Sequence, residues 1–264
     1  MRENSVPAIT AYQMRDFWEK VDNGLINEKV FASFLKNPRR FSECELDMPL
    51  AEHIMGRYRV ISAAVMCEAW GFAPFHTGEV VPVIPIPYSI KVLEECAYEN
   101  YNHRADWRLV YLHGFSLREQ VRRCGCYIEG EKNSSKKVVF EKNTSWCDEE
   151  WANIEILPGY YLLNFKNGLG GGLSWEEQEK WIKDHCDGSV RACANMISEA
   201  LISIISVYGE KYIPHAVGHW GECYNENALF VDLITRSPTI LEIGKLPISK
   251  KGAYWLSAIT FRSK

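Results

Sequence analysis

The sequence lacks both an excess of positive charge and a long apolar run. Its 264 residues carry 30 lysines and arginines against 34 aspartates and glutamates, for a formal net charge of −4. Because nucleic-acid-binding proteins usually present a basic patch, this balance argues against DNA or RNA as a partner. The best apolar run, ALISIISVYG, falls short of the roughly 18 residues that cross a bilayer, and the amino-terminal residues lack the apolar centre of a signal peptide. We therefore expect a cytoplasmic protein with no membrane partner.

Recognisable cysteine spacing and catalytic motifs are also lacking. The nine cysteines form an odd set without a repeated interval, which fits reduced thiols better than a disulfide framework. The chain contains no G-x-S-x-G, H-E-x-x-H or S-x-x-K signature. The sequence therefore singles out no catalytic residue, and a protein without catalysis is favoured over an enzyme.

A glycine-rich stretch, NGLGGGLSWEE at 167–177, lacks what a phosphate-binding loop needs. It has neither the glycine spacing of a dinucleotide fingerprint nor the Lys-Ser/Thr pair of a P-loop. Glu176 and Glu177 suit the first turn of a helix but would repel a phosphate at that place. The stretch is predicted to be a connection from a strand to a helix, and we expect no bound cofactor.

The amino-terminal half reads as a partly helical α+β region. Apolar periodicity predicts a helical hairpin over 10–37, and three prolines make VVPVIPIPY at 80–88 an extended segment. A strand is predicted over 106–114, followed by a short helix that begins at Ser116. The polar stretch 129–151 then suggests a domain boundary near residue 150, which divides the chain into 1–150 and 151–264.

One further segment in this half is ambiguous. RYRVISAAVMCEAW at 57–70 is apolar on several sides, so it fits either a buried helix or a strand followed by a helix. Periodicity alone leaves both alternatives open.

The carboxy-terminal half has clearer signals. GYYLLNFK at 159–166 predicts a strand, and Ser174 with Glu177 forms a capping box that starts a helix to about His185. A second, long helix is predicted from Ser189 to Tyr208, where Gly209 ends it. From residue 215 onward, short apolar runs separated by glycines predict short strands and long loops.

A candidate metal or thiol site follows the long helix. His215, His219 and Cys223 recur every four residues, which on a helix would place three metal-competent side chains on one face. Because Pro214, Gly218 and Gly221 disfavour a helix there, a loop with Trp220 in the core is favoured. The same residues carry an alternative function, a thiol- or metal-dependent enzyme that uses Cys223 with His215 or His219.

The last hundred or so residues resemble the C-type lectin-like fold. The order of strand (YYLLNF), helix from Ser174, helix over 189–208, and a loop-rich β region ending in YWLSAITFRSK is similar to that of formylglycine-generating-enzyme relatives and of variable proteins of diversity-generating retroelements. The strings ADWRLVYLHGFSLREQ, LPGYYLLNF, SWEEQEKWI and YGEKYIPHAVGHWGE resemble those of uncharacterised bacterial and phage proteins. The resemblance implies that the first and last strands of the domain pair with each other.

It also implies a ligand-binding protein without catalysis, whose carboxy-terminal loops present a surface to a protein or other macromolecular ligand. In that family, mutagenic reverse transcription changes adenines in codons that cannot then yield Lys, Glu, Gln, Met or Trp, and LFVDLITRSPTIL at 229–241 contains none of these five residues. Its Ile and Leu content departs from the Tyr-, Asn- and Ser-rich surfaces of selected binders, so a fixed surface stays open beside a diversified one. Trp220 and Phe261 are expected in the core. The expected surface contacts are Asp232, Ile234, Arg236, Ser237 and Thr239.

A third alternative is a phage or defence-related factor that interacts with nucleic acid. It would depend on two basic spots, Arg39–Arg40 and Arg122–Arg123. With the acidic balance of the chain, this is the least favoured of the three functions.

Overall fold

The computed structural model describes most of the chain from residue 47 onward. The described residues are 18, 21, 47–70, 84–128, 138–142, 144–166, 172–186, 188–209, 212, 218–234, 239–251, 255–256 and 258–260. The chain divides into two compact units, Met1–Glu45 and Leu46–Lys264. In the first unit only Trp18 and Val21 are described, both as helical. The rest of the helical hairpin predicted at 10–37 lies outside the described residues.

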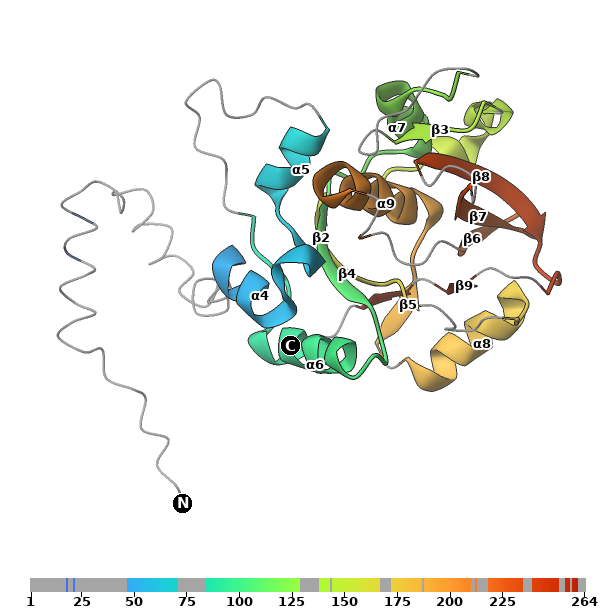
Figure 1. Cartoon of the computed structure of the whole chain (residues 1–264). Helices are drawn as coiled ribbons and strands as arrows, with labels where there is room; N and C mark the ends of the chain where they lie inside the picture. The colour runs from blue at the N-terminus through green and yellow to red at the C-terminus, as the bar shows by residue number, and fades with distance from the viewer. Residues whose placement is uncertain are drawn as a thin grey trace. The chain divides into compact units, whose positions relative to one another are not determined.

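The second unit contains two mixed sheets and is of the α+β class (Figure 1). The first sheet has β2 and β4 at its centre, which pair antiparallel from Trp107–Asn164 to Leu112–Gly159. All six residues of β2 are buried, as expected for a strand covered on both faces. The strands of this sheet, in spatial order, are β1 (Val60–Ile61), β2 (Trp107–Leu112), β4 (Gly159–Asn164), β10 (Ala258–Thr260) and β5 (Ser189–Arg191).

The second sheet is built around the hairpin of β7 and β8. These strands pair over seven residues, and the tight turn from β6 into β7 uses positive φ at Asn225 and Glu226. Such a turn matches the right-handed twist of the strands that it joins. The strands, in spatial order, are β3 (Val139–Phe140), β8 (Ile240–Pro247), β7 (Asn227–Leu233), β6 (His219–Tyr224) and β9 (Trp255–Leu256).

Gly244 of β8 gives the ring of Phe230 its place on β7. A Cβ atom at position 244 would come within 2.4 Å of the Phe230 ring. We predict that Gly244→Ala lowers the free energy of unfolding by about 2 kcal/mol, since the ring would have to move within a packed layer. Urea denaturation measures the change. Gly159→Ala is the matched control, because a Cβ there meets nothing within 4 Å, and an equal loss in both variants would contradict this reading.

Six helices within the described ranges pack around the sheets. Serine side chains cap three of them: Ser89 accepts from Val92 N, Ser116 from Glu119 N, and Ser174 from Glu177 N in a full capping box. The predicted helix starts at Ser116 and Ser174 are thereby confirmed. The helices are α4 (Met48–Met55), α5 (Ala63–Ala69), α6 (Ile90–Tyr101), α7 (Leu117–Cys124), α8 (Trp175–His185) and α9 (Ala194–Tyr208); short 3₁₀ turns cover Arg57–Arg59, Ser145–Asp148 and Glu150–Asn153.

Helix α9 is the centre of the unit. It contacts β2 of the first sheet and β6 and β7 of the second, and α5 and α7 pack against it (Figure 1). Every residue from Ala194 to Ile205 is buried, which is why its sequence is apolar on all faces. None of the helices within the described ranges is long and apolar enough to span a bilayer.

The structure corrects the predicted start of this helix. Ser189–Arg191 is strand β5, paired with β10, and the helix begins five residues later than Ser189, at Ala194. The cap explains the later start: Ala194 N donates to the Glu222 carboxylate at 2.5 Å, a partner 28 residues away. Local sequence signals cannot reveal a cap from a distant strand. The predicted end at Gly209 is confirmed, with φ of 82° at that residue.

Along the sequence, the boundary between the two compact units falls between Glu45 and Leu46. Residue 150, where the sequence suggested a boundary, lies within the second unit, because β2 and β4 on either side of it pair along their whole length. The ambiguous segment 57–70 is a strand followed by a helix, β1 and α5. The described part of the predicted extended segment, 84–88, is not helical and buries Ile86 and Tyr88.

Candidate active site

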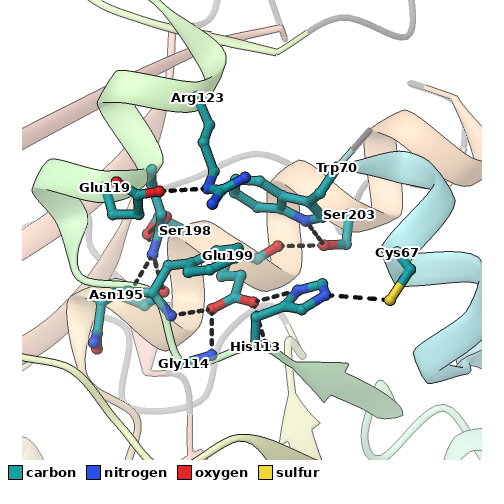
Figure 2. A network of polar contacts seen from close by, with 12 residues as sticks. Cys67, Trp70, His113, Gly114, Glu119, Arg123, Asn195, Ser198, Glu199 and Ser203 are labelled. Atoms are coloured by element: carbon teal, nitrogen blue, oxygen red, sulfur yellow. Dashed lines mark hydrogen bonds and ion pairs between the residues drawn. The ribbon is translucent and has the colours of Figure 1, made fainter. Parts of the chain in front are cut away.

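A fully buried carboxylate, Glu199 of α9, lies at the centre of a polar network (Figure 2). Its Oε1 accepts a hydrogen bond from His113 N at 2.5 Å, and its Oε2 accepts from Gly114 N and Phe115 N, each at 3.2 Å. A buried carboxylate is tolerated only when it is well paired, and three backbone donors supply that pairing. Glu199 therefore fixes the loop that joins β2 to α7.

Gly114 fixes the same loop from its other side. Its φ is 84°, and a Cβ atom there would lie 2.2 Å from the carbonyl oxygen of Ile156. Its own carbonyl accepts from Ile156 N at 3.2 Å. Only glycine fits this close approach, so the loop has one position relative to α9.

The side chain of His113 lies between Glu199 and Cys67. Its Nδ1 is 3.3 Å from Glu199 Oε1, and its Nε2 is 3.7 Å from the Sγ atom of Cys67 on α5 (Figure 2). In the tautomer with its proton on Nδ1, near the carboxylate, Nε2 is the acceptor and can take the thiol proton. In the free state of an enzyme, contacts of this kind are often longer than ideal hydrogen bonds. The three side chains form a line of thiol, imidazole and carboxylate.

Burial raises the pKa of the Cys67 thiol above its ordinary value. The neutral thiol is therefore the resting form, and His113 is placed to take its proton when the sulfur attacks. Cys67 is half-buried.

Aromatic rings hold the imidazole in place. The ring of Phe115 stacks on His113 with centroids 4.9 Å apart and planes at 10°, and Trp70 packs against Phe115 at 5.3 Å. Trp70 Nε1 donates to Ser203 Oγ at 3.1 Å, and Ser203 Oγ donates to the Glu199 backbone carbonyl at 2.6 Å. These hydrogen bonds join the carboxy-terminal end of α5 to α9.

A second set of buried hydrogen bonds fixes α7 against α9. The amide nitrogen of Gln120, which is fully buried, donates to the carbonyls of Phe115 at 3.0 Å and Asn195 at 2.9 Å. Ser198 Oγ donates to Gln120 Oε1 at 2.6 Å. These contacts hold Phe115, and through it the imidazole, against the helix that carries Glu199.

No protein-family model, no curated protein and no solved structure matches the chain. The arrangement of the residues in the structure is therefore the basis for a proposed function.

Three of the residues expected at a ligand surface are described, and they lie on or directly beside β7 and β8. Asp232 is half-buried on β7, and burial raises its pKa; Ile234 is half-buried just after this strand. Thr239 is only 3% exposed, which leaves little of its side chain to contact a ligand. Arg236 and Ser237 lie outside the described residues.

Of the three candidate metal ligands, two are described and one is not. His219 is 3% exposed on β6, and burial lowers its pKa to about 4; Cys223 is half-buried four residues later on the same strand. Trp220 is fully buried, as expected, while His215 and Phe261 lie outside the described residues. Within the described ranges, no group of three or more His, Cys, Asp or Glu side chains is arranged to hold a metal ion.

Sequence analysis did not bring Cys67, His113 and Glu199 together. They lie on α5, on the loop after β2 and on α9, with separations of 46 and 86 residues, so no local motif connects them. One signal was present: Glu199 is the only charged residue in the run ANMISEALISIISVY. A carboxylate in an otherwise apolar, buried helix requires a polar partner. Such a residue therefore indicates a candidate functional site.

Proposed function

We propose that the chain is a thiol-dependent enzyme that hydrolyses an acyl compound through Cys67. The observation that carries this proposal is the position of the imidazole, with Nε2 3.7 Å from Cys67 Sγ and Nδ1 3.3 Å from an oxygen of the fully buried Glu199. In this arrangement Cys67 is the nucleophile, His113 the general base and acid, and Glu199 the positioning residue. Thiol, imidazole and carboxylate in this order occur in hydrolases of unrelated fold.

The reaction would proceed in two halves. Cys67 attacks the carbonyl carbon while its proton passes to His113 Nε2, and the carbonyl electron pair moves to oxygen. The leaving group then departs with the proton from Nε2, which leaves a thioester on Cys67. Water attacks the thioester and gives a proton to Nε2; the sulfur leaves, recovers that proton, and the acid product is released.

Glu199 has a specific task in each half. When His113 takes a proton the imidazolium is charged, and a carboxylate 3.3 Å away stabilises this charge. Its bonds to the backbone of residues 113–115 keep the ring in one orientation.

Steady-state hydrolysis of p-nitrophenyl acetate, an activated ester, tests this function. We predict that the purified protein releases p-nitrophenolate faster than the uncatalysed rate and that Cys67→Ala lowers kcat/KM by at least about 10³-fold, to the residual level left without a nucleophile. Cys223→Ala is the control, because it is also a half-buried thiol. Activity that survives Cys67→Ala but not Cys223→Ala would refute the assignment and favour the alternative that uses Cys223.

A second candidate is a ligand-binding protein with a C-type lectin-like domain in its carboxy-terminal part. The pairing of β4 with β10 supports it, because these would be the first and last strands of that domain. The elements β4, α8, α9 and then β6 to β8 follow in the expected order, with the unexpected strand β5 between the two helices. The ligand, a protein or other macromolecule, would contact the β7–β8 end near Asp232 and Ile234.

The DNA around the coding sequence tests the diversified form of this candidate. A neighbouring reverse transcriptase and a near-copy of the last hundred or so bases that differs only at adenines would support it. A neighbourhood with neither would remove active diversification.

A further inference from the structure

An acyl-transfer reaction at Cys67 needs a hydrogen-bond donor for the negative oxygen that forms when the sulfur attacks. Such donors contribute a large part of the rate in enzymes of this kind. This requirement follows from the proposed function, and the inference below depends on that function.

Most donors around Cys67 are already committed. The backbone N–H groups of residues 113–115 bond to Glu199, and Trp70 Nε1 bonds to Ser203. At the start of α5, Ala63 N donates to the Tyr160 hydroxyl at 3.1 Å and Val65 N to Ser62 Oγ at 3.3 Å. The backbone N–H of Cys67 belongs to the hydrogen-bond ladder of the helix, since it is the fifth residue of α5.

Among the described residues, the hydroxyl of Tyr111 is a further donor beside His113. Tyr111 lies on β2 and His113 in the loop directly after this strand, and the two rings meet edge to face at 5.4 Å. The Tyr111 ring also contacts that of Tyr160 at 5.3 Å. The contact with the His113 ring, whose Nε2 is 3.7 Å from Cys67 Sγ, places Tyr111 beside the reacting group. Burial raises the pKa of Tyr111, so its hydroxyl keeps its proton.

The hydroxyl of Tyr111 differs from those of the other buried tyrosines. Tyr88 Oη accepts from Leu162 N at 3.0 Å and Tyr160 Oη from Ala63 N at 3.1 Å. Tyr111, only 8% exposed, makes no hydrogen bond through its hydroxyl to any residue in the described part of the chain. A tyrosine hydroxyl without a protein partner beside a nucleophile can donate its hydrogen bond to a bound substrate.

The geometry points to Tyr111 as the catalytic residue that donates a hydrogen bond to the oxyanion formed on a carbonyl substrate at Cys67. When the carbonyl electron pair moves to oxygen, the phenol donates its O–H to that oxygen without giving up the proton. When the C=O bond re-forms, the hydrogen bond weakens and the phenol is unchanged. This role restricts the substrates to carbonyl compounds such as esters, thioesters and amides.

Two reactions of the same thiol test the inference. Hydrolysis of p-nitrophenyl acetate passes through an oxyanion, whereas alkylation of Cys67 by iodoacetamide does not. We expect Tyr111→Phe to lower kcat for the ester by about 10²- to 10³-fold. The KM and the alkylation rate of Cys67 should stay within about twofold, because substrate binding and the thiol itself are unaffected.

Tyr161→Phe is the matched control, since Tyr161 lies next to Tyr160 on β4 and its hydroxyl bonds to Leu157 O, away from Cys67. An unchanged kcat in Tyr111→Phe, or an equal loss of hydrolysis and alkylation, would overturn the role of Tyr111. Either result leaves the function itself standing as long as Cys67→Ala is inactive. If Cys67→Ala keeps full activity, the proposed function fails and the oxyanion role fails with it.

Discussion

Replacing Glu199 by Gln is expected to lower the free energy of unfolding by about 3 kcal/mol and to lower kcat by at least about 10²-fold. The substitution keeps the shape of the side chain, but one carboxylate oxygen becomes an NH₂ group. That group would face backbone N–H donors of residues 113–115, and two donors cannot bond to each other. At least one buried backbone group would lose its partner, and the charge that stabilises the His113 imidazolium would disappear.

Urea denaturation and ester hydrolysis measure these two effects separately. The rate of Cys67 alkylation as a function of pH adds a third measurement, because loss of the carboxylate should move this profile while a purely structural defect would not. Glu94→Gln is the control: Glu94 is exposed on α6, where a substitution usually changes stability by less than about 0.5 kcal/mol. Wild-type stability and activity in Glu199→Gln would contradict the central position given to this carboxylate.

Lowering the pH from 7 to 4 is expected to remove about 3 kcal/mol of stability through His219 alone. Burial lowers the pKa of His219 from 6.5 to about 4 in the folded protein, so the unfolded chain binds a proton more readily between these values. The stability is therefore present above pH 6.5 and is lost as the pH falls through the folded value. His219 packs against Phe165 with ring centroids 5.4 Å apart, in a part of the core that excludes water.

The variant His219→Phe isolates this contribution. Burial raises the pKa values of Glu222, Asp232 and Glu242, and these carboxyl groups act in the opposite direction, since they stabilise the folded state as they become protonated. Urea denaturation at pH 7 and at pH 4.5 should show that wild type loses more stability on acidification than the variant does. Equal losses in the two proteins would mean that His219 is accessible to protons in the folded state.

Elements with local signals could be predicted from the sequence, and elements that depend on distant partners could not. The helices at Ser116 and Ser174 carry their own caps, and β4, β7 and β8 carry branched and aromatic residues; these predictions are confirmed. Strand β5 and the start of α9 depend on β10 and on Glu222, so the sequence placed them inside one helix. The boundary near residue 150 was inferred from polarity, whereas the pairing of β2 with β4 crosses it.

The candidate site shows the same division. Cys223 and His219 were candidates because they lie four residues apart, yet His219 is buried in the core. Cys67, His113 and Glu199 were inconspicuous because each comes from a different element and none belongs to a spaced motif. Only the packing of α5 and β2 against α9 brings them together. When the residues of a site come from three distant segments, few local sequence signals indicate it. In this chain the signal is a glutamate, Glu199, in an apolar helix.

Mass spectrometry of the protein mixed with p-nitrophenyl acetate and quenched within the first turnovers tests the central claim most directly. If Cys67 is the nucleophile, one acetyl group forms on the peptide that carries Cys67 and is then lost in the wild-type protein. We expect this acetyl group to form much more slowly in Glu199→Gln. In Cys67→Ala we expect no acetyl group on the corresponding peptide. Acetylation spread evenly over the accessible cysteines, or none on Cys67 while the ester is hydrolysed, would contradict the central claim.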